Sequence, residues 1–238
     1  MKIEELKIKI FADGAEIAEM MQEYQKPYIK GFTTNPTLMK KAGIKEYLLF
    51  AKEITDKITD LPISFEVFSD DFDIMEKEAK VLSKLGSNVY IKIPITNSKG
   101  ETSVPLVRKL SDQGLQLNIT AIFTFEQAKQ IIEVLAPNTK NILSIFAGRI
   151  MDTGIDAMPI VQEVVTICKK KPGTEVLWAS CREVYNIIQA NNSGADIITV
   201  TNDILRKIPS LGKDLEQFSL ETVQMFARDS LAIGFSIL

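Results

Sequence analysis

The segment Val89-Tyr90-Ile91-Lys92-Ile93-Pro94-Ile95 places a lysine in the middle of an apolar run. Alternation along a β-strand puts its odd-numbered residues on one apolar face and puts Tyr90, Lys92 and Pro94 on the opposite face. An amine shielded from water by apolar neighbours is more readily neutral and nucleophilic, and it can then attack a carbonyl group to form a Schiff base. The simpler alternative is an edge strand whose lysine prevents pairing with other chains.

Short β-like segments alternate with longer helical segments along the chain. The eight predicted strands cover residues 7–13, 31–35, 63–68, 89–95, 115–123, 142–146, 175–181 and 196–200, and the amphipathic stretches between them include 16–24, 46–58, 74–85, 126–135 and 159–169. Eight such units in 238 residues predict an α/β protein with a single (β/α)₈ TIM barrel, for which roughly 250 residues is typical. A doubly wound open sheet is the alternative, but no G-x-G-x-x-G motif follows the first strand.

Two further helical segments exceed a minimal barrel, at residues 38–41 and 215–231. We therefore predict one domain over residues 1–238 with a C-terminal helical tail over 212–238. Apolar residues recur in the tail at helical spacing, namely Phe218, Val223, Phe226 and Leu231. The tail is expected to cover either the barrel floor or a neighbouring subunit.

Composition excludes several classes of function. A net charge of −3 provides no basic stripe for nucleic acid or an anionic membrane, and no apolar run is long enough to span a bilayer. The absence of histidine excludes Ser-His-Asp and Cys-His nucleophiles and His-ligated metals. The start of the chain has no signal-peptide pattern, and the two cysteines, Cys168 on a predicted helix and Cys181 in a predicted strand, suit reduced thiols. We expect a soluble, cytoplasmic protein.

The barrel prediction requires chemically active side chains on inward faces near the strand C-termini, where this fold holds its active sites. Every predicted strand except the last meets that requirement. In chain order the candidates are Asp13, Asn35, Glu66, Lys92, Asn118, Thr120, Ser144, Arg149, Ser180 and Arg182. In the seventh strand, alternation predicts that Trp178, Ser180 and Arg182 point inward. The last strand offers only Thr199 and Thr201, which are too common to interpret.

Some of these residues also have a purely structural explanation. Asp13 begins a capping box, Asn35 precedes a proline as a helix N-cap, and Ser180 suits an N-cap as well. Glu66 is harder to explain, because an inward mid-strand glutamate is costly without a partner. Taken together, an amine, two carboxylates, hydroxyls, an amide and two arginines at one rim describe a Schiff-base site for a phosphorylated keto compound.

The sequence resembles the transaldolase family and, within it, the short members related to fructose-6-phosphate aldolase. The segments that carry the resemblance are Phe11-Ala12-Asp13-Gly14, Gly31-Phe32-Thr33-Thr34-Asn35-Pro36-Thr37, Ser64-Phe65-Glu66-Val67, Ile91-Lys92-Ile93-Pro94-Ile95-Thr96, Leu117-Asn118-Ile119-Thr120-Ala121-Ile122-Phe123, Ser144-Ile145-Phe146-Ala147-Gly148-Arg149-Ile150, Ala179-Ser180-Cys181-Arg182 and Gly194-Ala195-Asp196-Ile197-Ile198-Thr199-Val200. They run from the first strand to beyond the last, so the resemblance covers nearly the whole chain.

The resemblance implies a class I aldolase-type barrel and assigns a role to every candidate except Asn118. Lys92 would form the Schiff base, Asp13 would act as acid and base at the C4 hydroxyl, and Glu66 with Thr120 would position a water that shuttles protons. The residues that would bind substrate are Asn35 and Ser144 at the dihydroxyacetone unit, Arg149, Ser180 and Arg182 at the phosphate, and Phe146 near the imine. No metal or organic cofactor is implied, because the lysine itself supplies the electron sink.

Two positions separate the subfamilies. Fructose-6-phosphate aldolases resemble this chain but carry glutamine where Glu66 stands and tyrosine where Phe146 stands. The resemblance therefore favours a transaldolase, a transferase of the pentose phosphate pathway that moves a dihydroxyacetone unit from fructose 6-phosphate or sedoheptulose 7-phosphate to erythrose 4-phosphate or glyceraldehyde 3-phosphate. The alternatives are a fructose-6-phosphate aldolase-type lyase and a non-catalytic sugar-phosphate binding barrel.

Two loops depart from the family pattern. Residues 97–102 form a longer and more polar loop than the family's usual turn, which we expect to border the donor site, and residues 151–157 also drift from the usual acidic loop. Both leave the natural donor and acceptor sugars open. Since short family members carry an apolar C-terminal helix that packs on neighbours, the resemblance implies a homo-oligomer that binds small sugar phosphates.

Overall fold

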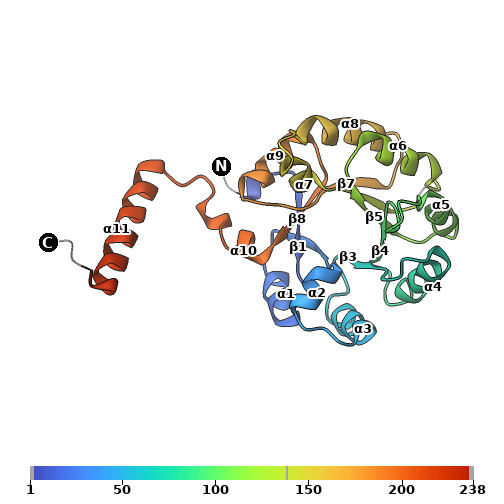
Figure 1. Cartoon of the computed structure of the whole chain (residues 1–238), viewed down its shortest axis with the longest axis horizontal. Helices are drawn as coiled ribbons and strands as arrows, with labels where there is room; N and C mark the ends of the chain where they lie inside the picture. Colours follow the sequence, from blue (N-terminus) through green and yellow to red (C-terminus); the bar gives the residue numbers. More distant parts are fainter. Residues whose placement is uncertain (1–2, 138, 236–238) are drawn as a thin grey trace.

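The computed structural model describes residues 3–137 and 139–235, and within them eight parallel strands close into a barrel (Figure 1). The strands are β1 (Lys9–Asp13), β2 (Ile29–Thr33), β3 (Ile63–Glu66), β4 (Val89–Pro94), β5 (Leu117–Ile122), β6 (Asn141–Ile145), β7 (Thr174–Trp178) and β8 (Ile197–Thr201). Each strand pairs with the next, and β8 pairs with β1. The predicted (β/α)₈ barrel is confirmed, and the open doubly wound sheet is excluded.

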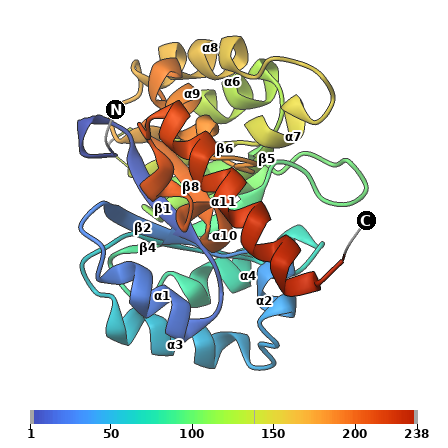
Figure 2. The same cartoon turned by 90° about the vertical axis from the view of Figure 1, so that its left-hand side faces the viewer.

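Helices surround the barrel on its outside, except for the last one, α11 (Leu215–Ile233), which extends away from it (Figures 1 and 2). They are α1 (Ile17–Tyr24), α2 (Pro36–Lys41), α3 (Tyr47–Lys57), α4 (Phe72–Leu82), α5 (Val104–Asp112), α6 (Phe125–Val134), α7 (Ala147–Met151), α8 (Met158–Cys168), α9 (Tyr185–Ser193), α10 (Asn202–Leu205) and α11 (Leu215–Ile233), with short 3₁₀ turns at Ile3–Glu5 and Ile208–Ser210. The extra helix predicted at residues 38–41 is α2, and the tail helix is α11. Cys168 ends α8 as expected.

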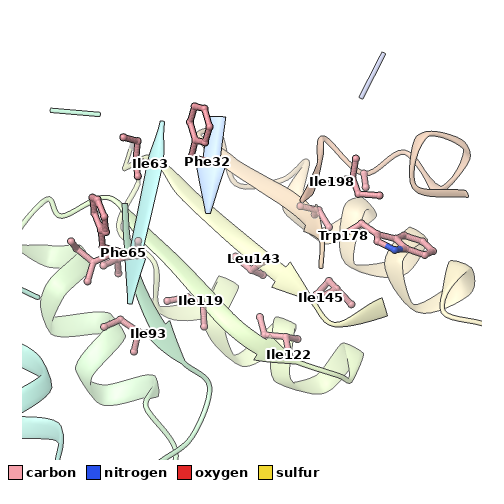
Figure 3. Close-up of a cluster of buried hydrophobic side chains, with 14 of the residues drawn as sticks. Phe32, Ile63, Phe65, Ile93, Ile119, Ile122, Leu143, Ile145, Trp178 and Ile198 are labelled. Atoms are coloured by element: carbon pink, nitrogen blue, oxygen red, sulfur yellow. The ribbon is translucent and has the colours of Figure 1, made fainter. Parts of the chain in front are cut away.

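The main hydrophobic core lies between the strands and the surrounding helices. Ile91 and Ile93 are fully buried there, on the face of β4 that alternation predicts, and Figure 3 shows their neighbours from the adjoining strands. Full burial of one such side chain stabilises the fold by roughly 1.5–3 kcal/mol. This layer therefore fixes which face of each strand points into the barrel.

A second, smaller apolar cluster fills the lower barrel interior, including Phe11, Tyr90, Ile142 and Ile197. Each precedes by two residues a polar side chain higher on the same strand, because residues i and i+2 share a face. Gly31 makes room for this cluster, since a Cβ at that position would lie 2.5 Å from the Phe11 ring. These apolar side chains therefore lie one layer below the polar side chains Asp13, Lys92, Ser144 and Thr199, which line the cavity described below.

The seventh strand differs from the prediction. β7 ends at Trp178, and Ser180 adopts a left-handed backbone with φ of 65°, so the regular alternation stops there. Leu177 belongs to the interior cluster, whereas Trp178 is fully buried in the core against the helices. The predicted inward direction of Trp178 was wrong. Cys181 lies in the loop past β7 rather than in a strand.

The tail helix α11 projects away from the barrel beyond α10 (Figure 1), and none of its residues is buried. The prediction that the tail covers the barrel floor was wrong for the described part of the chain; residues 236–238 lie outside it. Leu215 and Leu231 are 80% and 82% exposed. A large unpaired apolar surface thus remains on the protomer.

Among the described residues, no helix combines the length and the hydrophobicity that a bilayer span requires.

Candidate active site

A cavity of about 400 Å³ opens at the C-terminal ends of the strands. The ten residues to which the resemblance assigns a role all line it: Asp13, Asn35, Glu66, Lys92, Thr120, Ser144, Phe146, Arg149, Ser180 and Arg182. The other candidate, Asn118, does not line it; its side chain donates to the Ser64 hydroxyl and accepts from the Ser144 hydroxyl. Its size suits a small metabolite, and its position is where barrels of this type carry their chemistry. The structure therefore brings these ten residues together in one cavity.

Lys92 lies within the barrel and is only 7% exposed. Its Nζ lies 2.9 Å from Oε2 of Glu66 and donates a hydrogen bond of 2.8 Å to the carbonyl oxygen of Thr34. Glu66 is the direct register partner of Lys92 on the neighbouring strand, which explains the ion pair. The expectation of an amine among apolar neighbours was therefore wrong, and so was the edge-strand alternative, because β4 pairs with a strand on both sides.

Asp13 ends β1 inside the cavity and caps no helix, since α1 has Glu16 at its N-cap. Burial raises the pKa of the Asp13 carboxyl above its ordinary range. The charge of Lys92 and a 2.7 Å hydrogen bond from the Thr33 hydroxyl act in the opposite direction, while the charge of Glu66 adds to the rise. A carboxyl with a raised pKa is a stronger proton acceptor when ionised, which suits general acid–base chemistry.

Asn35 and Ser144 line the same cavity as Lys92, and each already makes one hydrogen bond within the protein. Oδ1 of Asn35 accepts from the backbone N–H of Leu38 at 3.0 Å, so Asn35 is the predicted N-cap of α2 and also lines the cavity. The Ser144 hydroxyl donates to Oδ1 of Asn118 at 2.6 Å. The Asn35 amide group thus remains a donor for a ligand, and the Ser144 oxygen remains an acceptor.

The arginines lie just beyond the ends of β6 and β7, Arg149 on α7 and Arg182 in the loop after β7. The guanidinium of Arg149 lies 5.4 Å above the Phe146 ring centroid, and Arg182 forms an ion pair with Asp152. Gly148 allows the start of α7 to approach Ser180 closely, because a Cβ at position 148 would lie 1.6 Å from the Ser180 carbonyl oxygen. Ser180 caps no helix, since α9 has Val184 at its N-cap. Two cations next to the half-buried Ser180 suit an anionic group such as phosphate.

Some parts of the cavity were not singled out from the sequence. Thr33 and Thr199 also line it, and their hydroxyls carry no signal that separates them from ordinary strand threonines. In contrast, none of the residues 97–102 lines the cavity; the loop folds on itself, with Asn97 accepting from the backbone of Lys99 and Glu101, and Ser98 bonds to Asp70. The expectation that this loop borders the site was wrong.

Within the described part of the chain, no group of three or more acidic, cysteine or histidine side chains is placed to hold a metal ion.

A buried lysine paired with a carboxylate at the open end of a (β/α)₈ barrel defines a barrel suited to Schiff-base chemistry on a carbonyl compound. The chain belongs to the transaldolase/fructose-6-phosphate aldolase family, whose model matches residues 10–237.

Curated relatives support this assignment. A probable transaldolase of Thermoanaerobacter sp. (strain X514) is 36% identical over 215 residues, covering 89% of this chain and 95% of the relative. A probable transaldolase of Thermoplasma volcanium is also 36% identical, covering 89% and 93%. Among solved structures, the dihydrodipicolinate synthase of Rhodopseudomonas palustris aligns with a TM-score of 0.58 at 12% identity, covering 96% of this chain and 83% of that one. This last similarity shows the shared fold alone.

Proposed function

We propose that the protein is a transaldolase of the pentose phosphate pathway, acting on cytoplasmic sugar phosphates. The observation that carries the proposal is the buried Lys92–Glu66 pair, with Asp13 in the same cavity. The reaction would transfer a dihydroxyacetone unit from a ketose phosphate to an aldose phosphate. Family membership and the named relatives support this reaction class.

The first step is imine formation at Lys92. Glu66, 2.9 Å away, accepts a proton from the ammonium, and the neutral nitrogen attacks the ketose C2 carbonyl. A second proton passes from the nitrogen to the former carbonyl oxygen, which becomes a hydroxyl. Glu66 then returns its proton to this oxygen, either directly or through a water held with Thr120, and water leaves as the iminium forms. The carbonyl of Thr34 keeps the lysine chain aimed into the cavity.

The second step breaks the C3–C4 bond. The Asp13 carboxylate takes the proton of the C4 hydroxyl, the aldose phosphate departs, and the bonding electron pair moves into the iminium to give an enamine. The reverse sequence with a new aldehyde returns the proton from Asp13 to the acceptor oxygen. The raised pKa of Asp13 suits a residue that needs both protonation states within one turnover.

The third requirement is that the enamine survives until an acceptor arrives. Phe146 lines this cavity and packs 5.8 Å from Phe123, ring centroid to centroid, and it carries no hydroxyl that could protonate the enamine carbon. Phosphate binding by Arg149, Ser180 and Arg182 would recruit donor and acceptor in the same orientation, with Arg182 exchanging Asp152 for the phosphate. These features favour transfer over release of free dihydroxyacetone.

Acceptor dependence tests the proposal. With fructose 6-phosphate alone, we expect a single-turnover burst of glyceraldehyde 3-phosphate and little free dihydroxyacetone. Addition of erythrose 4-phosphate should give continuous turnover and form sedoheptulose 7-phosphate. Steady release of dihydroxyacetone without acceptor would instead identify an aldolase-type lyase, and binding with no cleavage would identify a non-catalytic barrel.

We further propose that α11 packs on another copy of the chain to form a homo-oligomer. The helix has 19 residues, none of them buried, and its apolar side chains include Phe218, Val223, Phe226 and Leu231 at 44–82% exposure. Monomers rarely expose contiguous apolar surface on this scale, which is characteristic of interfaces. Helix exchange between identical protomers would bury it in a closed symmetric assembly.

Light scattering coupled to size exclusion tests the assembly. The wild-type chain is expected to elute as an oligomer, and the variant V223E/F226E/L231E is expected to elute as a monomer with unchanged circular dichroism. The matched control E216K/R228E changes charges on the same helix and should remain oligomeric. A wild-type protein of one-chain mass, 26.6 kDa, would contradict the proposal.

A further inference from the structure

Two threonine hydroxyls lie beside Asp13 inside the barrel. The Thr33 hydroxyl donates to Oδ1 of Asp13 at 2.7 Å, and the Thr33 and Thr199 oxygens lie 2.5 Å apart. Thr33 is 3% exposed and Thr199 is 7% exposed. A continuous hydrogen-bonded chain therefore runs from β8 through β2 to the carboxyl group at the end of β1.

Barrel geometry explains why these two residues meet. Strands β8 and β2 flank β1, and interior layers of such barrels are built from alternate strands. Thr33 is the register partner of Asp13, whereas Thr199 is the register partner of Phe11, two residues earlier. The threonines thus meet across β1 while Asp13 reaches further into the cavity.

The direction of the chain follows from counting protons. The Thr33 hydroxyl has one proton, and its donation to Asp13 leaves Thr33 only as an acceptor toward Thr199. Thr199 must therefore donate to Thr33 whenever Asp13 is ionised. Donation by Thr199 strengthens the bond that Thr33 gives to the carboxylate, because successive hydrogen bonds polarise one another.

We infer that Thr33 and Thr199 are positioning residues for Asp13: their hydroxyl chain fixes Oδ1, leaves Oδ2 for the substrate hydroxyl, and stabilises the carboxylate form that begins bond cleavage. This inference rests on the proposed role of Asp13. It gives β8 a part in the reaction.

The hydroxyl chain opposes the influences that raise the pKa of Asp13. Burial raises the pKa of Asp13, and the charge of Glu66 adds to that rise, whereas Lys92 and the Thr33 hydrogen bond lower it. Asp13 also borders a second cavity. The other charged residues that line this second cavity are Glu16, Glu19, Lys41, Asp203 and Arg206. Only Lys92 and the Thr33 hydrogen bond lower the pKa of Asp13, so loss of a hydroxyl from the chain is expected to raise this pKa further.

Thr199→Val tests the inference, because valine keeps the shape and removes only the hydroxyl. Donor cleavage, measured as kcat/KM for fructose 6-phosphate, is expected to fall about tenfold. This is a part of the roughly 10²–10⁴-fold rate enhancement that general acid–base catalysis supplies. The rising limb of its pH profile is expected to move to higher pH. Thr199→Ser keeps the hydroxyl and should restore both the rate and the profile. Thr33→Val is expected to give a larger shift in the same direction.

An independent readout separates this inference from the proposed function. Borohydride trapping with dihydroxyacetone requires Lys92 but no bond cleavage, so Thr199→Val should trap as well as wild type. If wild type traps but the pH profile of Thr199→Val is unchanged, the hydroxyl chain has no positioning role. If wild type itself does not trap, the proposed function fails instead. Should Thr199→Val not fold, Thr199→Ala is measured in its place and is expected to show the same shift.

Discussion

Lys92→Met is expected to abolish transfer activity, with a loss on the order of 10⁴-fold or more, as follows when a covalent nucleophile is removed. Methionine retains most of the length of the lysine side chain but cannot form an imine. Intact mass after borohydride reduction with fructose 6-phosphate should show a three-carbon adduct on wild type, and peptide mapping should locate it on Lys92. The variant should show no adduct.

Lys99→Met is the matched control for this experiment. Lys99 is an exposed lysine of the loop at residues 97–102, outside the cavity, so its replacement should leave the adduct and the rate unchanged. Circular dichroism of Lys92→Met checks that Glu66, which loses its ion-pair partner, does not unfold the barrel. An adduct that persists in Lys92→Met would place the imine on another lysine and overturn the proposed mechanism.

Strand alternation predicted most of the site because a closed barrel leaves each strand only two faces. Once Ile91 and Ile93 face the helices, Lys92 must face the interior, and the same reasoning places Asp13, Glu66 and Thr120. Alternation could not show that Glu66 pairs with Lys92, since register between neighbouring strands is a tertiary property. The ion pair, and with it the first proton acceptor, required the structure.

The prediction failed where the backbone leaves regular β geometry. The left-handed conformation of Ser180 breaks the alternation after β7, so Ser180 reaches the cavity for a reason different from the one expected. Thr199 was missed because a lone threonine in a strand is common, and its importance depends on Thr33, which is distant in sequence. The position of α11 was equally unpredictable, because an amphipathic pattern shows that a face will be covered but not by what.

Asp13→Asn is expected to separate the two halves of the reaction. Asparagine retains an oxygen that can accept from Thr33 but cannot take the C4 hydroxyl proton, so donor cleavage should fall by roughly 10²–10⁴-fold. Imine formation with dihydroxyacetone, which has no C4, should persist in a borohydride trap. Equal loss of both activities would mean that Asp13 acts on the imine step or on folding rather than on cleavage.

The same variant, Asp13→Asn, is expected to lose activity but to gain stability against urea. Because burial raises the folded-state pKa of Asp13, its protonated form is favoured in the native protein, and the associated stability is present at low pH and lost as pH rises through the folded pKa. Above the unfolded-state pKa of Asp13, the raised folded-state pKa therefore costs the native state free energy that asparagine does not cost. Urea unfolding of Asp13→Asn at pH 8 should show a higher midpoint than wild type, and the difference should shrink as pH falls through the folded-state pKa. A variant that is both slower and more stable would identify Asp13 as a charge that the fold retains for its chemistry.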